Sequence, residues 1–152
     1  MKRSLTMSVG ALVLSQLLAF TALADPKCYS TGPLEEENSG IATFFVKVLN
    51  NDKEENVQVK IVAFDLDGLK SILREFAGEL DPLSSNFLVL EVGGTDEYEV
   101  QVKLDGKAAD KTLLGGFAKN ANDELVAAHR LVHSEWTEID CEDFGVATDT
   151  DG

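Results

Sequence analysis

The sequence predicts an all-β protein whose antiparallel strands form a sandwich or a barrel. Apolar and polar residues alternate along runs such as YEVQVKL, which is the pattern of a strand with one buried face. Turn-forming residues separate these runs, as in NNDKEEN, DLDG, DPLSSN and VGGTDE. Short alternating strands with a turn about every 8 to 12 residues are typical of antiparallel sandwiches.

The first 24 residues are predicted to be a secretory signal peptide that is cleaved after Ala24. Lys2 and Arg3 precede an apolar run that ends in Ala22-Leu23-Ala24, an A-x-A cleavage pattern. A retained membrane anchor is the alternative. No later segment approaches the ~20 consecutive apolar residues of a membrane span. We therefore expect a protein that is secreted, periplasmic or at the cell surface, with no stable membrane span after cleavage.

Length and charge limit the possible partners. Removing 24 of the 152 residues leaves 128, the size of one domain. The full chain has 13 basic and 27 acidic residues, and loss of Lys2 and Arg3 changes its net charge from −14 to −16. This charge argues against nucleic acid and anionic membranes, because both are polyanions that would repel the chain. The acids are dispersed, as on a solvated surface.

Two cysteines, Cys28 and Cys141, lie near the two ends of the exported chain. An even number of cysteines in an exported protein predicts a disulfide bond. A bridge that closes a loop of about 100 residues is worth roughly 4 to 5 kcal/mol on the chain-entropy model. We predict one intramolecular bridge, and two free or intermolecular thiols are the alternative.

Seven strands are predicted, at about residues 41–50, 56–65, 70–80, 86–92, 97–104, 112–120 and 125–139. Two of these segments also carry a helical pattern. LKSILREFAGEL has apolar residues at a spacing near 3.6, and NDELVAAHRLVHSEW has Asn122 at the position of a cap. We favour strands in both, because a chain of strands needs partners for its edges.

The flanking regions of the chain look irregular and acidic. They are residues 25–40 before the first predicted strand and residues 142–152 after the second cysteine. The predicted sandwich domain therefore spans 41–141, with an irregular N-terminal segment and a flexible acidic tail.

Three stretches carry the strongest signal for the fold: ATFFVKVLNNDKEENVQVKIVAFD, GELDPLSSNFLVLEV, and GGFAKNANDELVAAHRLVHSEW, which looks like a final hairpin. Together, over about residues 41–139, they resemble the immunoglobulin-like sandwiches of many secreted bacterial proteins. The resemblance is at the level of the fold, and it implies a non-catalytic module without indicating a ligand. The chain departs from antibody-type domains, because its cysteines are terminal and its only tryptophan, Trp136, lies in the last predicted strand. A disulfide across the core is therefore not expected.

The two histidines, His129 and His133, are four residues apart, and their use depends on the local structure. On a helix they would stand one turn apart, close enough to share a metal ion with Glu135 and Asp140. On a strand that rises ~3.3 Å per residue they lie about 13 Å apart, too far for one ion. The strand prediction makes them surface or rim residues. The helical reading keeps a metal-binding or enzymatic extracellular domain as an alternative.

Two Asp-x-Asp-Gly stretches, with Asp65 and Asp67 in one and Asp149 and Asp151 in the other, resemble the start of a calcium loop. An EF-hand needs a bidentate Glu at its twelfth position, where the first stretch has Phe76. We predict a hairpin turn at Asp65–Gly68, with a weak structural Ca²⁺ site as the alternative.

Motifs for catalysis are missing from the sequence. There is no G-x-S-x-G elbow, no H-E-x-x-H, no G-x-G-x-x-G and no phosphate loop. A copper–zinc dismutase needs more imidazoles than two, and a blue-copper site lacks its methionine because Met1 and Met7 leave with the signal peptide. We therefore expect a non-enzymatic binding or structural module without a cofactor, whose partner is a protein or another cell-surface component. A self-assembling surface or fibre subunit that pairs through edge strands is the further alternative.

Overall fold

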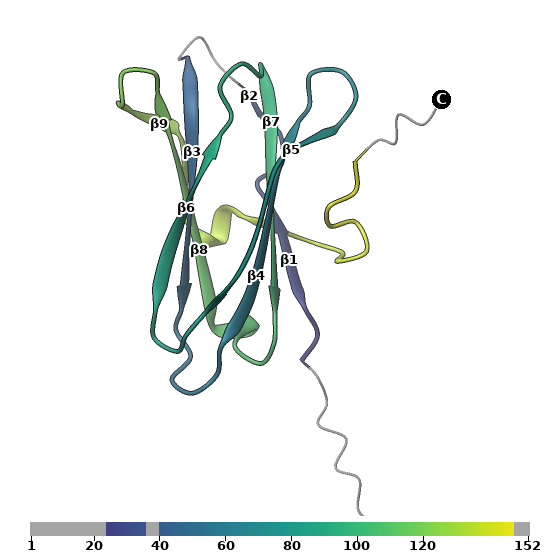
Figure 1. The fold of residues 1–152 in the computed structure, drawn as a ribbon, viewed down its shortest axis with the longest axis vertical. Coiled ribbons are helices and arrows are strands. Elements are labelled where there is room, and N and C mark those ends of the chain that lie inside the picture. Colours follow the sequence, from purple (N-terminus) through teal and green to yellow (C-terminus); the bar gives the residue numbers. More distant parts are fainter. Residues whose placement is uncertain (1–23, 36–39, 148–152) are drawn as a thin grey trace, which may run out of the picture.

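The computed structural model describes residues 24–35 and 40–147, and these residues form an all-β sandwich, as predicted. Two antiparallel sheets face each other (Figure 1). Apart from strands, the described residues contain two single-turn 3₁₀ helices, η1 (Ala109–Lys111) and η2 (His133–Glu135). None of the helices found there is long or apolar enough to cross a membrane.

The first sheet, sheet A, has the order β10-β1-β7-β4-β5, and β2 also pairs with β7. The second, sheet B, has the order β6-β3-β8-β9. The strands are β1 (Lys27–Ser30), β2 (Leu34–Glu35), β3 (Ile41–Asn50), β4 (Val57–Asp65), β5 (Ser71–Leu80), β6 (Ser85–Glu91), β7 (Glu97–Asp105), β8 (Thr112–Asn120), β9 (Leu125–Leu131) and β10 (Thr137–Ile139). The chain changes sheet after β2, β3, β5, β6, β7 and β9, so β4–β5 and β8–β9 are the hairpins.

The first six predicted strands agree with β3 to β8 within one or two residues, but the seventh does not. Residues 125–139 form β9, then η2, and then β10, which belongs to sheet A. The break occurs because the chain must cross from sheet B to sheet A, and Trp136 fills the space between the sheets at this crossing, with only 5% of its surface exposed. Neither segment with a helical pattern forms an α-helix, since 71–80 and 125–131 are strands.

The N-terminal segment 25–40, which was expected to be irregular, contains β1 and β2. Strand β1 pairs with β10 on one side and with β7 on the other. Four residues are too few to show an alternation, and the partners of β1 lie about 70 to 110 positions away in the sequence, so only the assembled sheet makes this strand visible. Among the described residues, the sandwich therefore begins at residue 27 and not at residue 41.

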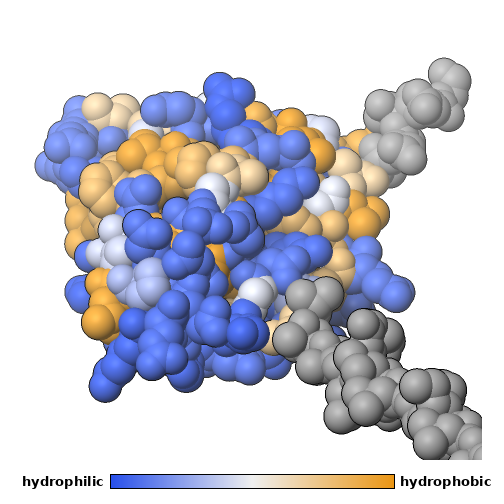
Figure 2. All heavy atoms as spheres, turned by 60° about the horizontal axis from the view of Figure 1, so that its bottom comes forward, coloured by the Kyte–Doolittle hydropathy of each residue, from blue (hydrophilic) through white to orange (hydrophobic). Residues whose placement is uncertain are grey.

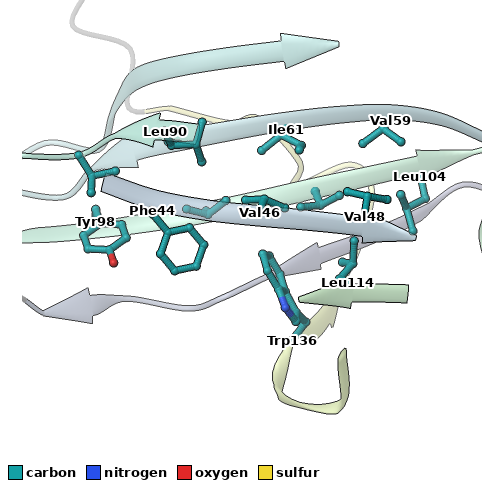
Figure 3. Packing of buried hydrophobic residues seen from close by; sticks show 14 of the residues in the cluster. Phe44, Val46, Val48, Val59, Ile61, Leu90, Tyr98, Leu104, Leu114 and Trp136 are labelled. Carbon is teal, nitrogen blue, oxygen red and sulfur yellow. The ribbon is translucent and has the colours of Figure 1, made fainter. Parts of the chain in front are cut away.

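The core lies between the two sheets. Figure 3 shows the buried side chains of β3, Phe44, Val46 and Val48, among those of sheet A, with the Trp136 ring between Phe44 and Leu114. Phe44 lies directly over Gly116 of β8, where an added Cβ would come within 2.7 Å of the Phe44 ring. Gly116 thus makes room for the largest side chain on β3, which is a packing reason for a glycine inside a strand.

Candidate binding face

The outer face of sheet A is covered in its middle, over parts of β4 and β7. Val62 and Phe64 lie on the outer side of β4, outside the core between the sheets, yet both are fully buried. The C-terminal segment runs beyond this face (Figure 1). Its Gly145 amide donates a hydrogen bond to the side-chain oxygen of Gln101 at 2.8 Å. Part of the predicted flexible tail, residues 142–147, therefore packs on the sheet, and the rest lies outside the described residues.

A satisfied carboxylate lies under this cover. One oxygen of Glu99 accepts hydrogen bonds from Ser30 Oγ at 2.6 Å and Gln101 Nε2 at 2.8 Å, and the other lies 2.7 Å from Lys70 Nζ. Burial pushes the pKa of Glu99 up, but the three donors together outweigh it, so the pKa lies below its ordinary value. Lys70 also lies 4.2 Å from the centre of the Phe64 ring. Every charge here has a partner, which is the arrangement of a structural network.

The predicted disulfide joins Cys28 and Cys141 across 113 positions. Cys28 lies in β1, and Cys141 follows β10, the strand beside it in sheet A. The bridge therefore ties the C-terminal segment to sheet A and does not cross the core between the sheets. A disulfide bridge fits an oxidising, extracytoplasmic compartment.

His129 is buried, with 5% of its surface exposed, whereas the strand prediction placed it at the surface or rim. A β-bulge in β9 between Val126 and Leu131 turns it inward. Its Nε2 donates to the carbonyl of Glu35 at 2.9 Å, because a carbonyl can only accept, and its Nδ1 accepts from the Tyr98 hydroxyl at 2.8 Å. Burial raises the pKa of Tyr98, which keeps this hydroxyl a donor. Both ring nitrogens are thus used to join the two sheets.

The other candidate metal ligands are also held in hydrogen bonds. His133 Nδ1 accepts from the Leu114 amide at 3.1 Å. In the β4–β5 hairpin, Asp65 accepts from the Asp67 amide, and the Asp67 carboxylate accepts from the amides of residues 96 and 97. Over the residues that the structure describes, no cluster of three or more His, Cys, Asp or Glu is arranged to hold a metal ion. Asp149 and Asp151 lie outside this part of the chain.

The outer face of sheet B carries aromatic rings that no segment covers in the described structure. Phe45 and Phe117 stack at 4.6 Å between ring centres, and Phe87 lies 6.4 Å from Phe45. Phe87 is 60% exposed. Figure 2 shows that apolar residues gather in a band on the surface, beside a largely hydrophilic end. Contiguous exposed apolar patches are a common feature of interaction sites.

A shallow hollow of about 520 Å³ lies next to these rings, between β8 and β9. Its floor is Gly115. A side chain at this position would lie on the outer face of β8, whereas one at Gly116 would face the core. Its apolar walls are Leu113, Phe117, Leu125, Leu131 and Val132. A Cβ at Gly115 would meet its nearest atoms at 3.8 and 3.9 Å, which is ordinary contact. The hollow therefore exists because this outward position lacks a side chain, and it is not required by packing.

Positive charge borders the hollow. Lys47 of β3 and Arg130 of β9 line it together with His133. Neither Lys47 nor Arg130 lies within ion-pair distance of a carboxylate in the described ranges, although the chain has a net charge of −14. An apolar floor beside unpaired cations is suited to a group that combines an apolar body with a negative charge.

Sequence reasoning missed this face, although one signal for it was present. The pair Gly115-Gly116 inside a predicted strand indicates that something approaches the backbone closely on each side.

Comparison with known proteins found no match, whether with a family model, a curated protein or a solved structure.

Proposed function

We propose that this chain is an immunoglobulin-like, non-catalytic binding module of the extracytoplasmic space, and that the outer face of sheet B binds a protein partner. Seven longer strands, β3 to β9, in two antiparallel sheets support the immunoglobulin-like assignment. The predicted signal peptide and the Cys28–Cys141 bridge support the location. The observation that carries the binding role is the hollow over Gly115, which is apolar, bordered by cations and left open on a bare face.

The chemistry of the hollow indicates what the partner presents to it. An apolar side chain can occupy the space above Gly115, and an adjacent Asp or Glu can reach Lys47 or Arg130. Charge-assisted hydrogen bonds at the rim set the orientation, while burial of the apolar group supplies most of the affinity. The partner segment is therefore both apolar and acidic.

The test fills the hollow without disturbing the fold. In Gly115→Leu a side chain occupies the site, and the matched control Ala77→Leu adds apolar bulk at an exposed position of β5 in sheet A. The probe is anilinonaphthalene sulfonate, an aromatic anion with the chemistry that the hollow favours. We expect its fluorescence to rise with wild type and Ala77→Leu, and to fall at least about fivefold with Gly115→Leu. Equal fluorescence for all three proteins would contradict the assignment of the site.

A second measurement addresses the partner itself. Immobilised wild type, Ala77→Leu and Gly115→Leu are incubated with envelope proteins of the parent organism, and the retained proteins are quantified by mass spectrometry. The proposal expects one set of proteins that is retained by wild type and Ala77→Leu and lost with Gly115→Leu. Retention that is independent of the hollow would overturn it.

A further inference from the structure

The four edges of the two sheets are not equally protected against pairing with another strand. An exposed edge presents free backbone N–H and C=O groups, and proteins block such edges with charges, bulges or short strands. At the edges of sheet A, β5 carries Arg74, Glu75 and Glu79 and contains a bulge, and β10 is three residues long. At one edge of sheet B, β9 is interrupted by its bulge.

The remaining edge, β6, has none of these devices over most of its length. Its first six residues, SNFLVL, contain no charge and no proline. Its pairing with β3 runs without a register shift from Ser85 to Glu91. Two of its outward side chains are apolar and exposed, Phe87 by 60% and Val89 by 42%. An apolar, regular, uncharged edge strand is a template for the addition of another strand.

The hydrogen-bond pattern shows which backbone groups are free. The Asn50 amide donates to the carbonyl of Ser84, and the Val92 amide donates to Ala42. Because bonding residues alternate along an antiparallel ladder, the even positions between them face β3 and the odd positions face the open edge. The amide of Phe87 is accordingly bonded only to the side-chain oxygen of its neighbour Asn86, at 2.8 Å. This local bond can be exchanged for one to an incoming strand.

We propose that the β6 edge is the contact through which two copies of this chain pair, so that sheet B continues as one antiparallel sheet across a two-fold axis at Leu88. In this register Phe87 of each copy stands opposite Val89 of the other on the outer face, and their backbones exchange hydrogen bonds as a bonded pair. The two exposed apolar residues of β6 thereby bury each other. A contact in which the same strand serves both copies is the usual form of a two-fold dimer.

Charge also favours a second copy in this register. Glu91 and Lys47 are exposed, and neither has an ion-pair partner in the described part of the chain. The two-fold axis places Glu91 of one copy on the same face as Lys47 of the other, two strands across and two residues along. It keeps the two Glu91 side chains at opposite ends of the contact. The net charge of −14 on each copy opposes association, so pairing is expected to strengthen with salt.

The first experiment is sedimentation velocity of the oxidised protein over a hundredfold range of concentration, in low and high salt. We expect a monomer–dimer equilibrium in wild type that shifts toward dimer in high salt. Val89→Lys places a charge on the edge and is expected to weaken dimerisation by at least tenfold, whereas the control Leu69→Lys, at an exposed apolar position between β4 and β5, leaves it unchanged. A wild type that stays monomeric throughout, or a dimer that Val89→Lys leaves intact, would overturn the proposal.

The second experiment tests the register. A mixture of Phe87→Cys and Val89→Cys proteins is expected to form an intermolecular disulfide under mild oxidation, because these positions stand opposite each other. Val89→Cys alone is expected to cross-link at least tenfold less, since its two copies are offset along the strand. Equal cross-linking of both samples would exclude this register. The result is independent of the Gly115 hollow, so binding by the hollow and pairing through β6 can fail separately.

Discussion

The inner faces of the two sheets are both apolar and buried, whereas their outer faces differ in how far they are covered. The outer face of sheet A is partly covered: a segment tied by a disulfide packs on its middle, where a carboxylate has three donors. The outer face of sheet B has no covering segment among the described residues, and it carries the exposed Phe87, a hollow, and two cations without a carboxylate partner in that part of the chain. The difference lies in the C-terminal segment, which packs on the first sheet and not on the second.

The Cys28–Cys141 disulfide ties the C-terminal segment to sheet A. Removing it is therefore expected to have the largest effect on stability. The double variant Cys28→Ser, Cys141→Ser releases a link across 113 residues. The expected loss is about 3 to 5 kcal/mol in the free energy of unfolding. Urea denaturation of the variant and of the oxidised wild type measures it, with the reduced wild type as the control. A loss below about 1 kcal/mol would show that the bridge does not hold the cover in place.

Gly115 and Gly116 distinguish the two sides of sheet B itself. In Gly116→Ala the new Cβ would stand 2.7 Å from the Phe44 ring, so we expect a loss of about 1 to 3 kcal/mol through overpacking. In Gly115→Ala the new Cβ meets only ordinary contacts, and the change is expected to be within about 0.5 kcal/mol. Thermal denaturation of the two variants compares the core side of β8 with its outer side at adjacent positions. Equal losses would mean that the outer hollow is also needed for packing.

The polar network under the cover of sheet A is expected to give an intermediate effect. Lys70→Met leaves the Glu99 carboxylate partly buried without its cation, at a cost of about 1 to 2 kcal/mol at neutral pH. Because the pKa of Glu99 is lowered in the folded state, the network stabilises the protein above the ordinary carboxyl pKa, and this stability is lost as the pH falls below about 4.

The pH dependence separates this network from other acids. The pKa of Asp52 is also lowered, by a hydrogen bond from Lys111 and by the amides of residues 54 and 55, so wild type and variant share that contribution. Urea midpoints at pH 3 and pH 7 are compared, and Lys70→Met is expected to lose less on acidification than wild type. An equal fall of the urea midpoint in both proteins would show that the pKa of Glu99 does not depend on Lys70.

Changes on the bare face are expected to have the smallest effect on stability. Leu125 is 53% exposed at the wall of the hollow, so Leu125→Ser should alter the free energy of unfolding by less than about 0.5 kcal/mol. The same change should weaken binding of the anionic fluorescent probe severalfold, because it removes apolar contact. Calorimetry and fluorescence titration on one sample measure both quantities. A large loss of stability with unchanged binding would reverse the roles assigned to the two faces.

Much of the architecture could be predicted from the alternation of apolar and polar side chains in the sequence alone. Strands β3, β4, β7 and β8 could be predicted because each buries alternate residues over nine or more positions, and a period of two is then visible locally. The Asp-Gly turn between β4 and β5 and the pairing of Cys28 with Cys141 were also predictable, the first from turn chemistry and the second from an even count in an exported chain.

Other features were decided only by contacts between distant residues. Strand β1 is too short to have a pattern, and it exists because β7 and β10 pair with it. His129 is buried because a bulge turns it toward Tyr98 and Glu35, which lie in the other sheet. The C-terminal segment packs on sheet A because β10, which precedes it, joins that sheet beside β1. A strand of three residues has too short a pattern to show this pairing in the sequence.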